Sequence, residues 1–309
     1  MRPPSGSEVL RRFTGDLVPR ATRGPDGRYG PPIPVGRRVE LPGRGTTFVR
    51  EIEGPPGAPT VLLLHGWMAS AGLNWYRTFE ALGREFHVVA PDLRGHGRGL
   101  RSRRHVRLAD SADDIGVLLD VLGTGPVITA GYSMGGPIAQ LLWHRHPEQV
   151  SGLVFCATST QFRRGVARDW FSDAWLGGLA GMARVTEPLA FLPAAGARLL
   201  RSARAHRPAG FLEWATEEVR RHDLRMLMES ARAIMRYDAS SWIREVDVPS
   251  SVVITNRDLV VSPTAQSELA AAIPGASIIE HAGGHTACSM PTFAMPMVDA
   301  CRDVAWRAA

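Results

Sequence analysis

The sequence contains no lysine, so its 36 lysine-plus-arginine positions are all arginine, set against 30 acidic residues for a formal charge of +6. The excess is spread along the chain and is densest in RSRRHVR at residues 101–107. No aromatic interleaving or nucleic-acid motif accompanies this run, so we expect no nucleic-acid partner. We favour a solvated loop here, with peripheral contact to phosphate or anionic lipid as the alternative.

Cysteine is scarce as well. The chain has three cysteines, Cys156, Cys288 and Cys301, which are odd in number and far apart in the sequence. No pair has the spacing of a disulfide framework or a zinc site. We therefore predict a reducing environment, no metal ion and no cofactor.

Long apolar runs are missing too. The first residues, MRPPSGSEVLRRFTGD, have no apolar stretch behind their charges, so we expect no secretory signal. The least polar segment, residues 174–197, is interrupted by Arg184, Glu187 and two prolines, which is not typical of a membrane span. The prediction is a cytoplasmic location, while the sequence leaves the oligomeric state open.

Residues 1–36 are rich in Pro, Gly and Arg, and we expect a surface tail there without helix or ladder pairing, with order beginning near Val39. Beyond it, short β-branched or apolar runs alternate with longer segments of helical spacing, which predicts an α/β fold with a mostly parallel sheet and helices on both faces. The expected strands are RVEL, TTFVREIE, TVLLLHG, FHVVAPD, PVITAGYS, SGLVFCA, SVVITN and SIIEHAG.

The strand signal stops for about ninety residues between SGLVFCATST and SVVITN. We predict a helical cap at residues 161–245, inserted into a core made of residues 37–160 and 246–309. The cap carries several tryptophans, among them Trp170 and Trp175, which we propose as substrate contacts together with Trp67 and Met68. Aromatic residues at helical spacing pack in a core more often than they bind a ligand, and that interpretation is the favoured one.

The stretch TAGYSMGGPIAQ, residues 129–140, places Ser133 between Gly131 and Gly135, after an apolar strand and before an amphipathic helix. A strand, GxSxG and a helix in succession form a nucleophile elbow, in which the serine hydroxyl stands at the carboxyl edge of the sheet. The glycines remove side chains that would collide in so tight a turn. We predict that Ser133 is a nucleophile.

A serine at its ordinary pKa needs a histidine base and a carboxylate that orients the base, in the chain order Ser, acid, His. Asp258 follows the strand SVVITN, and His285 follows the next strand in HAGGHTACSMP. Asp258 could instead cap the helix PTAQSELAAAI, and Asp238 and Asp247 are less well placed competitors.

Two further features complete the predicted site. The backbone amides of Met134 and Trp67 are our candidates for the oxyanion hole, and His65 is expected to hold the Trp67 loop through local bonds. His281 stands four residues before His285, but the intervening Ala-Gly-Gly is poor helix and lacks the central Glu of a zinc motif, so a structural role is favoured.

At these positions the chain resembles the α/β-hydrolase fold superfamily over residues 38–309. The motifs that carry the resemblance are LLLHGW at 62–67, APDLRGHG at 90–97, GYSMGG at 131–136, RHPEQV at 145–150, Asp258, and GGH at 283–285. One departure is Arg98, since relatives often have a small residue after GHG; it leaves the conformation of that loop open.

The resemblance implies chemistry of the serine-nucleophile branch, because the dehalogenase and epoxide hydrolase branches use Asp where this chain has Ser133. We expect a serine hydrolase that cleaves small-molecule carboxylic esters with an apolar acyl or aryl group. Carbon-carbon bond hydrolysis and cofactor-free perhydrolysis on the same residues are alternatives, as is a catalytically silent ligand-binding protein.

Overall fold

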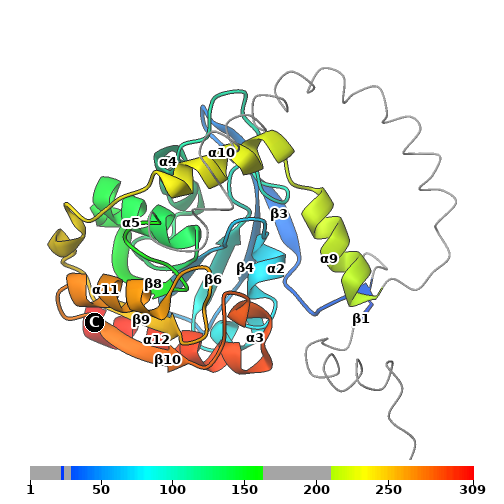
Figure 1. Cartoon of the computed structure of the whole chain (residues 1–309). Helices are drawn as coiled ribbons and strands as arrows, with labels where there is room; N and C mark the ends of the chain where they lie inside the picture. Colours follow the sequence, from blue (N-terminus) through cyan, green and yellow to red (C-terminus); the bar gives the residue numbers. More distant parts are fainter. Residues whose placement is uncertain (1–21, 24–28, 163–209) are drawn as a thin grey trace, which may run out of the picture.

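Figure 1 shows the computed structural model of the chain, which describes residues 22–23, 29–162 and 210–309. Its strands are β1 (Thr22–Arg23), β2 (Tyr29–Gly30), β3 (Gly36–Leu41), β4 (Gly45–Ile52), β5 (Thr60–Leu64), β6 (His87–Pro91), β7 (Val127–Tyr132), β8 (Val150–Cys156), β9 (Ser250–Thr255) and β10 (Ser277–His281). Its helices are α2 (Ala71–Trp75), α3 (Phe79–Gly83), α4 (Leu108–Leu122), α5 (Gly135–Arg145), α9 (Phe211–Arg220), α10 (Leu224–Met235), α11 (Pro263–Ala272) and α12 (Ala294–Ala308).

The predicted sheet is confirmed, and each of the eight expected runs forms a strand. The strand order is β10-β9-β8-β7-β5-β6-β4-β3. β3 and β4 pair antiparallel with each other, and β4 pairs antiparallel with β6, while every other neighbouring pair in this sheet is parallel. In the β5–β7 pair Leu64 is opposite Gly131, so the loop that leaves β5 begins beside the loop that leaves β7.

Both faces of the sheet are covered, as continuous apolar strands require. In β5, Leu62 and Leu64 belong to a core formed with α4, α5 and α11. Val61 and Leu63 point to the other face, where the core includes residues of α3 and α12. Figure 1 shows the same layers, with α4 and α5 on one side of the strands and α3 and α12 on the other. The central strands are therefore rigid supports for the loops at their ends.

The chain leaves the sheet after β8 and returns at β9, with α9 and α10 in the described part between them. Asp223 caps α10 by accepting the Met226 amide hydrogen at 2.9 Å. Buried Leu227 and Ile234 face inward from α10, as expected for an amphipathic helix on a core. Figure 1 shows both helices (yellow-green to yellow) outside the sheet, as predicted for a cap. The boundaries at 161 and 245 stay a prediction.

β3 begins at Gly36, close to the expected start of order near Val39. The tail prediction was wrong in one detail, because Thr22–Arg23 and Tyr29–Gly30 form a short antiparallel ladder. The reason is tertiary: a β-carbon on Gly30 would lie 3.1 Å from Cδ1 of Trp214 in α9. The second strand thus packs against a helix far along the chain, a support that local sequence does not reveal.

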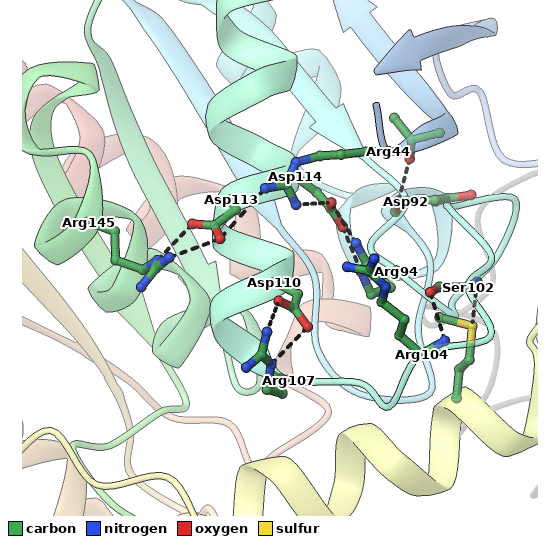
Figure 2. Close-up of polar contacts among 12 residues, drawn as sticks. Arg44, Asp92, Arg94, Ser102, Arg104, Arg107, Asp110, Asp113, Asp114 and Arg145 are labelled. Atoms are coloured by element: carbon green, nitrogen blue, oxygen red, sulfur yellow. Dashed lines mark hydrogen bonds and ion pairs between the residues drawn. The ribbon is translucent and has the colours of Figure 1, made fainter. Parts of the chain in front are cut away.

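Arginine–aspartate pairs fasten the start of α4 to its surroundings (Figure 2). Arg94 donates two 2.7 Å hydrogen bonds to the Asp114 carboxylate, which also accepts from Arg44 at 2.9 Å. At the preceding residue of α4, Arg145 of α5 binds the Asp113 carboxylate in the same two-pronged way. These paired contacts use the planar fork that arginine has and lysine lacks.

The arginine-rich run 101–107 is partly engaged within the protein. The Arg101 guanidinium donates to the carbonyl oxygens of Gly97, Gly99 and Arg221. Arg107 pairs with Asp110 in the first turn of α4 (Figure 2). Among the residues that the structure describes, no helix has the length and apolar character needed to cross a membrane.

Candidate active site

Ser133 lies in a strained turn between β7 and α5. Its φ of +50° is unusual for a residue with a β-carbon. A β-carbon on Gly131 would lie 2.5 Å from the Gly135 carbonyl oxygen, and one on Gly135 would lie 2.1 Å from that of Leu64. Only glycine fits at these two positions, and the serine side chain is thereby directed out of the turn. Its backbone is fixed by a 2.9 Å hydrogen bond from the Ser133 amide to the Cys156 carbonyl.

The three predicted side chains form one continuous hydrogen-bonded chain. Ser133 Oγ lies 3.0 Å from His285 Nε2, and His285 Nδ1 lies 2.9 Å from Asp258 Oδ2. Nδ1 faces a carboxylate and therefore carries the proton, which leaves Nε2 as the acceptor of the Ser133 hydroxyl. This is the arrangement in which an imidazole can remove a proton from serine.

Asp258 is held in place and kept charged by its surroundings. Its Oδ1 accepts the backbone amides of Val260 and Val261 at 2.8 and 2.9 Å, and Oδ2 also accepts the Thr255 hydroxyl at 2.9 Å. Burial raises the pKa of Asp258, but the bonds from His285 and from the two amides outweigh it, so the pKa lies below its ordinary value. The carboxylate is therefore ionised and oriented toward the imidazole.

Residues 66–70, which we call the oxyanion loop after the role predicted for Trp67, pass directly beside Ser133. A β-carbon placed on Gly66 would lie 3.4 Å from Cβ of Ser133. As expected, His65 forms local bonds: its Nδ1 donates to the Gly66 carbonyl at 2.8 Å and its Nε2 accepts the Leu93 amide at 2.9 Å. The loop therefore brings Trp67 close to Ser133, from the end of the strand next to β7.

The residues proposed as substrate contacts differ in where they lie. Met68 lies in the oxyanion loop at φ +59°, with 45% of its surface exposed. The indole Nε1 of Trp67 donates to the Leu227 carbonyl of α10 at 2.8 Å, so this side chain packs toward the cap. Trp170 and Trp175 lie outside the described residues.

The competing residues are engaged elsewhere. Asp238 accepts the Ser240 amide, and Asp247 accepts the Trp143 indole at 3.1 Å. His281 is buried with Nε2 3.1 Å from the Thr292 hydroxyl. In the part of the chain that the structure describes, no cluster of three His, Cys, Asp or Glu side chains could hold a metal ion.

Three supporting residues were not anticipated from the sequence. The Tyr132 hydroxyl donates to the His285 carbonyl at 2.7 Å, and Asn74 Oδ1 accepts the Gly66 amide at 2.9 Å. Thr158 donates from its hydroxyl to the Ser133 carbonyl at 2.8 Å. Their partners are 8 to 153 positions away, and a single sequence gives no signal for such contacts except that Tyr132 precedes the serine.

A model of the alpha/beta hydrolase fold family matches residues 59–289, about three quarters of the chain. The chain belongs to this family. The matched region contains the oxyanion loop, Ser133, Asp258 and His285, so the whole candidate site lies in the part shared with other α/β-hydrolase fold proteins.

Two individual relatives are similar over shorter stretches. The chain is 38% identical to Lipase LipV of Mycobacterium tuberculosis over 101 residues, covering 33% of this chain and 38% of the lipase. It is 38% identical to a pimeloyl-[acyl-carrier protein] methyl ester esterase of Chromobacterium violaceum over 106 residues, or 34% and 39% of the two chains. The chain thus matches less than half the length of these two relatives.

Solved structures show the same fold over most of the chain. A thermophilic esterase from Thermogutta terrifontis superposes with a TM-score of 0.67 at 20% identity, covering 88% of this chain and 99% of the esterase. An enol-lactonase from Burkholderia xenovorans LB400 has a TM-score of 0.60 at 23% identity, covering 81% and 93%. At such identities the likeness concerns the fold and not the substrate.

Proposed function

We propose that this α/β-hydrolase fold protein is a serine hydrolase that cleaves carboxylic esters through an acyl-enzyme. The observation that carries the proposal is the hydrogen-bonded chain from Ser133 through His285 to Asp258, with 3.0 and 2.9 Å between the partner atoms. The lipase and the methyl ester esterase among its relatives are consistent with an ester substrate.

In the proposed first step, Ser133 Oγ attacks the ester carbonyl carbon while its proton passes to His285 Nε2. Asp258 stabilises the imidazolium that results. When the tetrahedral intermediate collapses, the bond to the alcohol oxygen breaks and His285 returns the proton to the departing alcohol. Water then repeats the sequence on the acyl-enzyme, releasing the acid and restoring Ser133.

The negative charge on the carbonyl oxygen needs donors in that step. Met134 follows the serine at the start of α5, where backbone amides point outward and the helix dipole favours negative charge. Trp67 stands on the oxyanion loop beside the serine. We assign the amides of these two residues to the oxyanion, each donor contributing about 3 kcal/mol to the transition state.

A fluorophosphonate probe and a set of nitrophenyl esters test the proposal. The wild type should be labelled and should release nitrophenol, and Ser133→Ala should do neither. Ser159→Ala is a matched control, since Ser159 is buried but lies outside the hydrogen-bonded chain, and it should be labelled like the wild type. A correctly folded wild type that neither reacts with the probe nor cleaves any ester would contradict the proposal.

Acyl preference is a separate part of the proposal. Trp67 and Met68 on the oxyanion loop are apolar, so we expect esters of longer acyl chains or of aromatic acids to be cleaved with a higher kcat/KM than acetate. Nitrophenyl esters of increasing chain length measure this. A strict preference for acetate would refute the apolar acyl site while leaving the serine chemistry standing.

A further inference from the structure

The cap reaches the oxyanion loop at three of its five residues. Trp67 donates from its indole to the Leu227 carbonyl of α10, and the Ser70 hydroxyl donates to Glu218 of α9 at 2.8 Å. Between them, the Met68 carbonyl lies 3.1 Å from Nε2 of His222, just after α9. From the core side, Gly66 is held by Asn74 and by His65. Helices of the cap thus contact the loop beyond its first residue.

His222 joins two loops of the core. Its Nδ1 accepts the Gly97 amide at 2.8 Å, so that nitrogen carries no proton and Nε2–H is the donor to the Met68 carbonyl. Met68 has a φ of +59°, which is unfavourable for a residue with a β-carbon. The bond from His222 secures this residue directly after Trp67, whose amide is assigned to the oxyanion.

Glu218 provides the second connection and explains the departure at Arg98. The Glu218 side chain is only 1% exposed and accepts from Arg98 at 2.9 Å, from Arg221 at 2.6 Å and from the Ser70 hydroxyl. Arg98, where relatives often have a small residue, also lies over the Phe48 ring at 4.8 Å. Burial raises the pKa of Glu218, but Arg98 and the other partners outweigh it and keep the carboxylate charged.

Both connections end on the oxyanion loop from the same cap helix and the turn that follows it. Ser70 is at the same time the N-cap of α2, accepting the Leu73 amide, so Glu218 also fixes the point where the loop enters that helix. A loop held in this way keeps its donors preorganised, which is what lets an oxyanion hole stabilise a transition state.

We propose that His222 and Glu218 are positioning residues that hold the oxyanion loop in its active conformation, so that the seating of cap helix α9 governs turnover. The effect on turnover rests on the function proposed above. The claim that these two residues hold the loop in place rests on the contacts alone. Two measurements keep the two parts apart.

The first measurement is amide hydrogen exchange and needs no turnover. His222→Phe keeps the volume and removes both hydrogen bonds, and Glu218→Gln keeps the shape and removes the charge. In each variant we expect exchange in residues 66–70 to become at least about tenfold faster, while residues 131–136 of the elbow stay as protected as in the wild type. Unchanged exchange in residues 66–70 of both folded variants would overturn the proposal.

Matched controls come from the same residue types. His144→Phe replaces an exposed histidine whose ring stacks on Trp242, and Glu217→Gln changes the neighbour of Glu218, whose side chain is 45% exposed and pairs with Arg221. Both should leave exchange in residues 66–70 unchanged. If a control variant accelerates exchange in residues 66–70 as much as His222→Phe or Glu218→Gln does, the protein has loosened generally. In that case the specific role of His222 and Glu218 is wrong.

The second measurement separates positioning from mere support of the fold. With a nitrophenyl ester, His222→Phe should lower kcat about 10- to 100-fold and change KM less than about threefold, and a trifluoromethyl ketone that forms a tetrahedral adduct on Ser133 should lose affinity in proportion. A rise in KM with kcat unchanged would overturn the positioning role. A different outcome is that the wild type cleaves no ester, while exchange in residues 66–70 is still faster in the variants. That result would show that His222 and Glu218 do hold the loop and that the proposed ester chemistry is wrong.

Discussion

The phenol of Tyr132, the residue before the candidate nucleophile, donates a 2.7 Å hydrogen bond to the backbone carbonyl of His285, the candidate base. Residues 153 positions apart are thus joined directly at the site. The bond connects the backbone of the histidine loop to the elbow, so we expect the 3.0 Å separation of Ser133 Oγ and His285 Nε2 to depend in part on it.

Tyr132→Phe tests that dependence. A buried hydrogen bond contributes about 1 kcal/mol, so we expect kcat for a nitrophenyl ester to fall about 3- to 10-fold with KM nearly unchanged. Tyr237→Phe is the control, because its hydroxyl bonds to Gln140 Oε1 at 2.8 Å away from the three catalytic candidates. It should lower stability by a similar amount and leave kcat unaltered. Equal kcat values for Tyr132→Phe and wild type would contradict the role of this bond.

Asp258→Asn tests the choice of acid. An amide in this position can donate to His285 Nδ1 and stabilise the wrong tautomer, so we expect kcat to fall about 10³- to 10⁴-fold and fluorophosphonate labelling to slow by a similar factor. Asp247→Asn, at the competitor that contacts Trp143, should have the activity of the wild type. Full activity in Asp258→Asn together with inactivity in Asp247→Asn would reverse the assignment.

The arginine–aspartate pairs of α4 differ in burial and should therefore differ in their contribution to the free energy of unfolding. The side chains of Arg94 and Asp114 are both 8% exposed, and Asp114→Asn would leave Arg94 buried without its charge partner, at a cost of about 3 kcal/mol. Asp110 pairs with the exposed Arg107, and Asp110→Asn should destabilise the protein far less. Urea unfolding of both variants measures the difference, and equal losses would refute it.

The lowered pKa values of two buried histidines lead us to predict that the free energy of unfolding depends on pH. Burial lowers the pKa of His65 to about 3 and lowers that of His96 well below 6.5. Between those values and 6.5 the unfolded chain binds a proton that the folded chain does not, so stability is complete above 6.5 and decreases as the pH falls below it. Each group contributes up to about 1.4 kcal/mol per pH unit.

Urea unfolding at pH 7.5 and 5.5 measures this dependence. We expect a loss of about 3 kcal/mol for the wild type, from His65 and His96 together. His65→Asn should be less stable at pH 7.5 but lose less on acidification, whereas His144→Phe at the surface should follow the wild type. A free energy of unfolding that does not change between the two pH values would show that these imidazoles are not buried as neutral groups.

Much of the site was predictable because its parts are encoded locally. Gly131 and Gly135 flank Ser133 in the sequence, and the steric reason for them acts within a few residues. Asp258 and His285 each follow a recognisable strand, and parallel strands bring such positions to one edge of the sheet whatever the details of packing. The eight strands were predictable for a similar reason, since burial on both faces requires nearly continuous apolar runs.

Contacts between distant segments could not be predicted in this way. The pairing of β1 with β2 depends on Trp214 of α9, and the position of Tyr132 against His285 depends on how the last loop crosses the sheet. Arg98 appeared only as a departure from a motif, because its partner Glu218 stands 120 residues later in a helix whose placement no local pattern reports.

The amino-acid order by itself determined the sheet, the elbow and the residue types that carry the proposed chemistry, because steric fit in a turn and the burial of a strand are local requirements. Only the tertiary structure decided which groups hold those residues in place. Hydrogen bonds in which Tyr132 and His222 donate, and in which Asn74 and Glu218 accept, join segments that meet only after the core has packed. Polar pairs of this kind leave no periodic trace in a sequence.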